Sequence, residues 1–328
     1  MTSRSLDIVA IGDAIVDVIS TCEDSFLEQH ALRKGSMQLL SPAAAERLYD
    51  AMGSARETSG GSAANTMAGV AAMGGRAGFV GQVAGDQLGR IFMHDIRALG
   101  VHFDTPPLES KLPTGRCLIL VTPDAQRTMS TCPGASHELA PETIDMSLIA
   151  SAAILYLEGY LFGPELPRRA MMRAVDIAHS AGNKVAFTVS DSVVLDGRRD
   201  GLSGMINGGG IDLLFANEDE AMMLTGTADL DGAIAALTGK VPTLVVTRGA
   251  AGALAIDHGV RTDVPAVQVH KVVDTTGAGD LFAAGFLAAR CKGHGIDRQL
   301  LTGGIAAAEV IGHFGARPIA DLTALVKL

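Results

Sequence analysis

The sequence predicts an α/β fold in which a mostly parallel central sheet carries a small β-sheet cover. Apolar runs typical of buried strands alternate with helical segments before residue 100 and again after residue 150. Residues 101–131 contain strand-like runs with no helix between them. A glycine-rich turn at residues 274–280 opens a helix of small and apolar residues, which is typical of anion sites in α/β proteins.

The first half of the chain predicts the following elements in order. Residues 6–11 form a short apolar run that ends in Gly12-Asp13, as expected of a buried first strand. Strands are also expected at 18–21, 36–40, 77–83, 101–103, 116–122 and 128–131, with a hairpin tip at 122–127 and helices at 43–52, 66–73 and 90–99. The charged segment between 21 and 36 is expected to be irregular.

In the second half the alternation of strands and helices resumes. Strands are expected at 152–157, 184–189, 212–216 and 243–247, antiparallel edge strands at 253–257 and 259–264, and helices at 164–181, 221–224, 281–290 and 300–313. No repeat, low-complexity tract or linker divides the chain.

Composition narrows the class of protein. The 328 residues carry a formal charge of −10, which argues against nonspecific binding to nucleic acid or to an anionic membrane. The four cysteines lack C-x-x-C spacing and are expected to be buried free thiols of a reducing compartment. We find no secretory segment and no apolar run of membrane-spanning length, so a cytoplasmic location is expected.

The stretch Asp274-Thr275-Thr276-Gly277-Ala278-Gly279-Asp280 is the strongest chemical signal. Gly277 and Gly279 allow close approach of the backbone, and the helix that follows directs unpaired N–H groups at an anion. A carboxylate at such a site suits proton removal from a hydroxyl that attacks a phosphate. Alternatively, Asp280 only caps the buried helix.

Two further polar stretches contain candidates for binding hydroxyl groups. Asp13 and Asp17 follow the first strand, and open α/β sheets bind ligands beyond the carboxyl ends of their strands; an ordinary solvated turn is the alternative. The Gly60-Gly61 pair precedes a helix of small residues that Ser62 or a nearby polar group can cap. Asn65 on that helix carries donors and acceptors that suit a sugar diol.

Other catalytic motifs are missing from the sequence. There is no P-loop, no G-x-G-x-x-G after the first strand, no HExxH and no G-x-S-x-G. By contrast, Gly61-Ser62-Ala63-Ala64-Asn65, Asn217-x-x-Glu220 and the stretch 274–280 occur in an order that resembles the ribokinase-like (PfkB) kinases of carbohydrates and nucleosides. The resemblance extends from Leu6 to Pro318.

This resemblance implies a three-layer α/β/α fold with a small β-sheet lid. One catalytic domain would span residues 1–328, with the lid formed by about 14–40 and 102–132. The implied reaction is transfer of the ATP γ-phosphate to a primary hydroxyl. Asp280 would be the general base, and the N–H groups of Gly277, Ala278 and Gly279 would hold the transferred phosphoryl group.

The resemblance also implies roles for residues around the reacting groups. Asp13, Asp17, Gly61 and Asn65 would bind hydroxyls, and Arg127 on the lid would reach phosphate unless it is a solvated arginine. Thr247, Gly249, Gly252, Asn217 and Ala307 would line the nucleotide site. Glu220, with Asn217, would orient water-bound Mg²⁺, although helix capping is the alternative for Asn217. Asp274 and Thr276 would form a monovalent-cation loop that suits K⁺.

Within the family, Pro113-Thr114-Gly115-Arg116-Cys117 and Glu158-Gly159-Tyr160 look most like adenosine kinases. Asp13 and Thr276 depart from that pattern, so a kinase of ribose, fructose or a ketodeoxy sugar acid is the alternative. Tyr160 and Phe162 would stack on a base or belong to the core. A nucleotide sensor of kinase ancestry and a dehydrogenase are more distant alternatives. The expected partner is a small molecule, bound by a monomer or homodimer.

Overall fold

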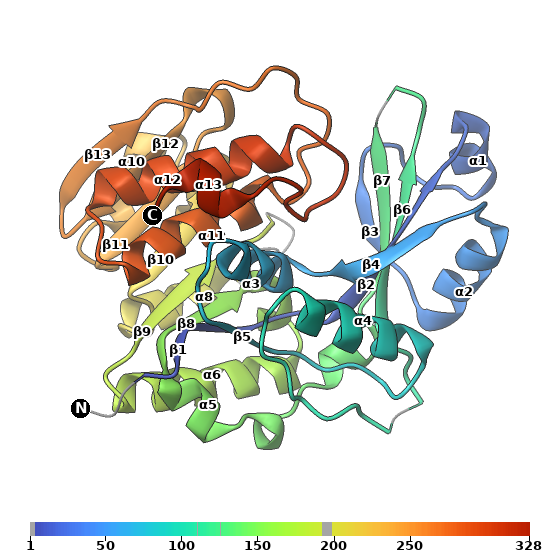
Figure 1. Cartoon of the computed structure of the whole chain (residues 1–328), viewed down its shortest axis with the longest axis horizontal. Helices are drawn as coiled ribbons and strands as arrows, with labels where there is room; N and C mark the ends of the chain where they lie inside the picture. The colour runs from blue at the N-terminus through green and yellow to red at the C-terminus, as the bar shows by residue number, and fades with distance from the viewer. Residues whose placement is uncertain (1–3, 110, 125, 192–198) are drawn as a thin grey trace.

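The computed structural model describes residues 4–109, 111–124, 126–191 and 199–328. Ala125, at the expected hairpin tip, lies outside these ranges. Figure 1 shows a large α/β body and a smaller sheet that stands at one end of it, with α1 and α2 on the outer side of the smaller sheet.

The central sheet has eight strands in the order β13-β12-β11-β10-β9-β8-β1-β5. Strands β11 to β5 in this order are parallel, and β12 and β13 add an antiparallel edge. Their bounds are β1 Leu6–Ile11, β5 Ala77–Val80, β8 Ala152–Glu158, β9 Lys184–Thr188, β10 Leu213–Asn217, β11 Thr243–Thr247, β12 Ala253–Asp257 and β13 Val260–Val264.

The smaller sheet has five strands in the order β3-β7-β6-β2-β4. Its bounds are β2 Ile15–Thr21, β3 Met37–Leu39, β4 Arg56–Gly60, β6 Gly115–Val121 and β7 Arg127–Cys132. Strand β4 lies outside the two segments that were expected to form the lid, and it pairs antiparallel with β2. Its sequence, Arg-Glu-Thr-Ser-Gly, has no apolar alternation that would mark it as a strand.

Helices cover both faces of the central sheet, so the α/β/α layering is confirmed (Figure 1). Side chains of α3, α4, α11, α12 and α13 pack on one face, and those of α5, α6, α8, α9 and α10 pack on the other. The bounds are α1 Asp24–Gln29, α2 Pro42–Ala51, α3 Ser62–Ala72, α4 Gln87–Ala98, α5 Met146–Ser151, α6 Glu165–Ser180, α8 Arg199–Asn207, α9 Glu218–Thr225, α10 Leu230–Leu237, α11 Ala278–Cys291, α12 Ile296–Val310 and α13 Leu322–Val326. Short 3₁₀ turns lie at Gly134–Glu138, Pro141–Thr143, Gly159–Phe162 and Gly249–Ala251.

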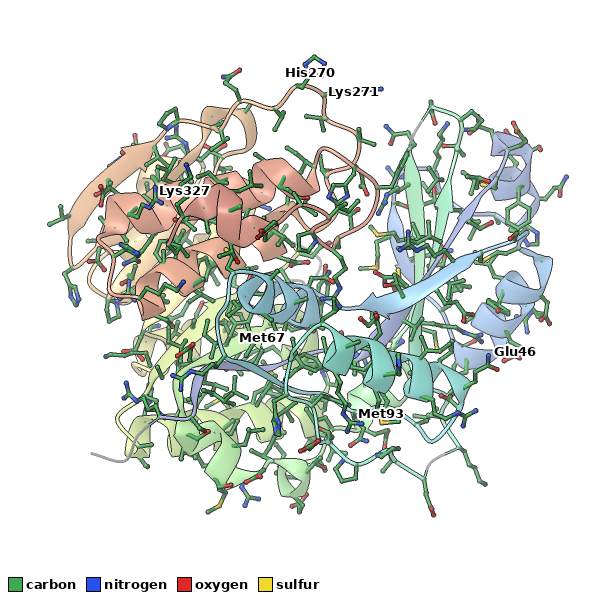
Figure 2. The ribbon with its side chains drawn as sticks, viewed as in Figure 1. Glu46, Met67, Met93, His270, Lys271 and Lys327 are labelled. Atoms are coloured by element: carbon green, nitrogen blue, oxygen red, sulfur yellow. The ribbon has the colours of Figure 1, made fainter. Side chains whose placement is uncertain are left out.

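Small residues allow α3 and α11 to pack closely, which places the two glycine-rich turns together. Residues 281–289 of α11 are all buried, as its apolar sequence predicts. A Cβ on Gly69 of α3 would lie 2.7 Å from the Cβ of Ala284. Met67, which Figure 2 labels on α3, is fully buried in the same layer. The N-terminal ends of the two helices therefore meet at one edge of the sheet.

Two local expectations were wrong. The segment between β2 and β3 contains the helix α1, whose six residues are too few to show a helical period. Residues 101–103 form only an isolated bridge from His102 to Gly78 instead of a strand. No helix in the described part of the chain has the length and apolar character that a bilayer crossing requires.

Candidate active site

A cavity of about 540 Å³ lies between the carboxyl ends of the central strands and one face of the smaller sheet. Its wall includes most of the positions that the sequence singled out. These are Asp13, Asp17, Gly61, Asn65, Tyr160, Asn217, Glu220, Thr247, Thr276, Gly277, Ala278, Gly279 and Asp280. Residues distant in sequence thus converge on the edge where α/β sheets bind ligands.

Asp280, in the first turn of α11, faces this cavity and does not turn into the core. Its Oδ1 accepts a hydrogen bond from the Ser62 hydroxyl at 2.6 Å, and its Oδ2 accepts from Asn65 Nδ2 at 2.9 Å. Ser62 or a nearby polar group was expected to cap α3, but the N-cap residue is Gly61 and no side chain makes a capping bond. The side chain of Ser62 holds the carboxylate instead.

The charge state of Asp280 results from opposing effects. Burial raises its pKa, while the hydrogen bonds from Ser62 and Asn65 and the positive charge of Arg317 lower it. The Oδ1 atom of Asn65 is buried and has no partner among the described residues. It therefore offers an acceptor to a ligand hydroxyl next to the carboxylate.

Backbone N–H groups gather beside Asp280. Gly277, at the N-cap of α11, has a left-handed φ of 76° that favours glycine, and a Cβ there would lie 2.7 Å from the Cβ of Ala316. Within the described ranges, no acceptor is recorded for the N–H groups of Gly277 and Gly279. The N–H group of Ala278 differs from the expectation, since it donates to Thr275 O at 3.2 Å. At the start of a 14-residue helix, free N–H groups of this kind suit the binding of an anion.

A buried carboxylate holds the two turns that carry Asp13 and Gly61. Glu158 is 0% exposed and accepts from Asp13 N and from Ala63 N, both at 2.6 Å. The hydroxyl of Ser136 donates to Asp13 Oδ1. Burial raises the pKa of Asp13, and the charge of His137 and the Ser136 bond partly offset this.

Asp17 does not lie in a turn, because it belongs to β2 of the smaller sheet. Its carboxyl group lies over Gly60 of β4, where a Cβ would approach it to 2.4 Å. Burial raises the pKa of Asp17 to about 6, against the charges of Arg317 and Arg127. The alternative interpretation, that Asp13 and Asp17 belong to an ordinary solvated turn, is therefore wrong, because both residues line the cavity.

Asn217 and Glu220 form a capping box at the start of α9. Asn217 Oδ1 accepts from Glu220 N at 2.8 Å, and the Glu220 carboxylate accepts from Asn217 N and Nδ2, both at 2.9 Å. Burial raises the pKa of Glu220 to about 7. In the described ranges no group of three or more metal-binding side chains occurs. Mg²⁺ that keeps its waters and binds phosphate oxygens needs no such group, so Glu220 suits a water-mediated contact.

Arg127 joins the smaller sheet to the 274–276 loop. Its guanidinium pairs with Asp274 Oδ2, and its Nη1 donates to Thr276 Oγ1 at 2.6 Å. Asp274 also accepts from Thr276 N at 3.0 Å and from Gly315 N at 2.8 Å. Asp274 and Thr276, which were expected to bind a monovalent cation, thus contact the positively charged guanidinium of Arg127. Binding of K⁺ by this loop stays a prediction, whereas a solvated Arg127 is wrong, since its side chain is only 9% exposed.

The expected nucleotide positions lie near the same edge, though not all reach the cavity. Thr247 at the end of β11 lines it. Gly249, Gly252 and Ala307 are not among the lining residues. Gly249 and Gly252 have positive φ values of 52° and 91° in the turn after β11, which explains glycine at both positions.

The smaller sheet contributes an apolar wall that the sequence did not reveal. Ile15, Cys117, Ile119 and Met129 line the cavity and pack together. Tyr160 also lines it, whereas Phe162 belongs to the core and meets Phe187 edge to face at 5.9 Å. Residues 117–121 are apolar without alternation, so the side of the strand that meets the cavity depends on strand pairing.

A carboxylate beside free N–H groups at a helix N-terminus, in a cleft under a β-sheet cover, is an arrangement that suits phosphoryl transfer to a hydroxyl group. The sequence profile of the pfkB family carbohydrate kinases matches residues 5–322, so the chain belongs to that family.

Similar proteins include kinases of both sugars and nucleosides. A fructokinase of Klebsiella pneumoniae is 30% identical over 299 residues, which cover 89% of this chain and 96% of that protein. The solved structure titled adenosine kinase from Sinorhizobium meliloti has a TM-score of 0.93 and 44% identity, covering 98% of each chain. The solved structure of a probable sugar kinase from Rhizobium etli has a TM-score of 0.93 and 42% identity, covering 99% of this chain and 98% of that one.

Proposed function

We propose that this kinase phosphorylates the primary hydroxyl of a nucleoside, and that its acceptor is adenosine, giving AMP. The apolar wall of Ile15, Ile119 and Met129 carries the choice of acceptor. A purine presents a flat apolar surface that such a wall removes from water, whereas a sugar alone presents mainly hydroxyls. The similarity to a structure titled adenosine kinase supports the same choice.

Asp280 is the proposed general base. Its carboxylate takes the proton as the hydroxyl oxygen attacks the γ-phosphorus, and the bond from that phosphorus to the leaving ADP oxygen breaks. Ser62 and Asn65 donate to the two carboxylate oxygens and so fix its orientation. Geometry of this kind is a precondition for proton transfer at a useful rate.

The backbone at the start of α11 is the proposed site for the transferred phosphoryl group. The N–H groups of Gly277 and Gly279 have no recorded acceptor in the described ranges, so they need no rearrangement to meet charge on the phosphoryl oxygens. Ala278 N–H must leave the Thr275 carbonyl to contribute. Losing one such donor typically costs about 3–4 kcal/mol in the transition state.

Asp13, Asp17, Gly61 and Asn65 are proposed to bind the ribose hydroxyls. The free Oδ1 of Asn65 and the cavity-facing carboxylates are acceptors, as hydroxyl donors require. Closure of the smaller sheet over them, held by Arg127, would exclude water from the reaction.

The nucleotide is proposed to lie along Thr247, Gly249, Gly252, Asn217 and Ala307, with Glu220 orienting waters of Mg²⁺. When bound, Mg²⁺ would neutralise charge on the phosphate oxygens. We derive no step through K⁺, because Asp274 and Thr276 hold Arg127.

Location and assembly belong to the same proposal. The four cysteines are free, which suits the reducing cytoplasm, although only Cys117 and Cys132 are buried and Cys22 and Cys291 are half-buried. The protein would act as a monomer or a homodimer on a small molecule.

A sugar kinase is the second candidate, and the 30% identity to a fructokinase favours it. The experiment that separates the candidates compares kcat/KM for adenosine, inosine, ribose, fructose and a ketodeoxy sugar acid with ATP as donor. We expect adenosine to exceed fructose by at least a hundredfold. Preference for fructose would reverse the choice of acceptor, and tight ATP binding without any transfer would indicate a nucleotide sensor.

A further inference from the structure

Arg317 connects three segments that meet behind the cavity. It lies after α12, in the loop whose Gly315 N–H donates to Asp274 and whose Ala316 packs against Gly277. Its Nη1 donates to Ala64 O in the first turn of α3 at 2.7 Å. Its Nη2 donates to both O and Oγ of Ser59 in β4, each at 3.0 Å.

The acceptor on α3 lies next to the residues that hold the base. Ala64 stands between Ser62 and Asn65, which donate to the two oxygens of Asp280. A bond to the Ala64 carbonyl therefore fixes the turn from which both donors project. On its other side, Ser59 is held by Asp95 of α4, which accepts from Ser59 N at 2.9 Å.

We propose that Arg317 is a positioning residue for the phosphoryl transfer, which fastens the first turn of α3 to β4 and so holds Asp280 in its reactive orientation. This inference rests on the proposed function, because it assigns Asp280 as the base. The planar guanidinium fork suits the task, since its two amino groups reach acceptors on different elements. A lysine ammonium is a single point and cannot hold the same pair of segments with the same geometry.

Arg317 also contributes charge. Its positive charge lowers the pKa values of both Asp280 and Asp17, while burial lowers its own pKa to about 10. The titratable and polar groups that face Asp280 or Arg317 come from every element packed around them. They are Asp17 on β2, Ser62 and Asn65 on α3, Asp95 on α4, Tyr156 and Glu158 on β8, and Tyr160 in the 3₁₀ turn after β8.

Two substitutions separate fork geometry from charge. Arg317→Lys keeps the positive charge but loses the two-armed guanidinium. Its kcat should therefore fall on the order of tenfold at every pH, while the apparent pKa values of the pH–rate profile stay unchanged. Arg317→Met loses both, so the acid limb of kcat/KM should also move to higher pH and the loss should be larger at pH 6 than at pH 9. Arg199→Met is the matched control, because Arg199 donates to two main-chain carbonyls, Leu224 O at 3.0 Å and Thr225 O at 2.8 Å, at a distance from this cluster.

A second readout does not require turnover. A ¹³C-carboxyl NMR titration of Asp280, assigned with Asp280→Asn, should show a higher pKa in Arg317→Met than in wild-type protein. If the wild-type protein phosphorylates nothing, the proposed function fails and this titration still tests Arg317. If Arg317→Met does not fold, Arg317→Gln removes the charge and retains donors for Ala64 and Ser59. An unchanged Asp280 pKa on loss of the charge, or wild-type kcat in Arg317→Lys, would overturn the proposal.

Discussion

The Ser62 hydroxyl donates a hydrogen bond to Asp280 Oδ1 at 2.6 Å across a separation of 218 residues. This bond joins the two glycine-rich turns that begin α3 and α11. The close packing of those helices, where Gly69 of α3 lies against Ala284 of α11, brings the turns together. A small-residue helix, which by itself indicates only tight packing, here determines the position of the proposed base.

Replacing Ser62 with alanine should lower kcat/KM on the order of tenfold, since hydrogen bonds to charged groups contribute about 1.5–3 kcal/mol. The bond from Ser62 lowers the pKa of Asp280, so its loss should also move the acid limb of the pH profile to higher pH. Ser151→Ala, which removes a bond to Leu148 O on the remote helix α5, is the control. A pH profile that does not move would contradict the assignment.

Replacing Arg127 with methionine should lower the free energy of unfolding by about 3 kcal/mol, because it leaves a buried carboxylate without its partner. The Asp274 side chain is only 2% exposed. The double variant Arg127→Met, Asp274→Asn should recover part of the loss. Lys34→Met breaks exposed ion pairs with Asp24 and Asp124 in the same part of the protein, and it should change the free energy of unfolding much less, because water screens exposed pairs. Equal losses in the free energy of unfolding for Arg127→Met and Lys34→Met, measured by urea unfolding, would contradict a stabilising buried pair between Arg127 and Asp274.

Replacing Asp17 with asparagine should stabilise the fold at pH 8 and not at pH 3. Burial raises the folded-state pKa of Asp17 to about 6, above its usual 3.8, so the folded protein binds the proton more tightly than the unfolded chain. Stability is therefore lost as the pH rises from about 4 to 6, and the neutral amide avoids that loss. Asp50→Asn, at an exposed position, is the control. The stabilised variant should bind the acceptor less well, because residues of binding sites are often retained at a cost in stability. A difference in the free energy of unfolding between variant and wild type that does not vary with pH would argue against a buried Asp17.

Replacing Met129 with alanine should raise the KM for adenosine about tenfold and leave the KM for ATP unchanged, because about 1.4 kcal/mol of apolar contact with the base is lost. Met172→Ala, at a position on α6 that is 39% exposed, is the control. A raised KM for fructose with an unchanged KM for adenosine would instead place a sugar against this wall.

Local patterns in the sequence were sufficient to predict much of the fold. The parallel strands, the buried helix α11 and the glycine-rich turn were predictable because each depends on neighbouring residues. Strand β4 and helix α1 were not, since one is polar throughout and the other is short. Their places come from pairing with β2 and from packing against the smaller sheet.

The site was predictable where a residue belongs to a local motif. Asp280, Gly277 and Gly279 line the cavity as expected. Glu158 and Arg317 were not recognised as supports of the site, because their partners at Ala63 and Ala64 lie 95 and 253 residues away. No periodicity encodes such contacts. The pairing of Arg127 with Asp274 likewise depends on how the smaller sheet sits over the central one.

The most direct measurement is turnover by Asp280→Asn with ATP and the preferred acceptor, alongside ATP affinity by calorimetry. The account predicts that kcat falls by about 10²–10⁴-fold, the usual contribution of a general base, while the dissociation constant for ATP stays within about threefold of wild type. Turnover comparable to that of the wild-type protein would contradict the claim that Asp280 takes the proton.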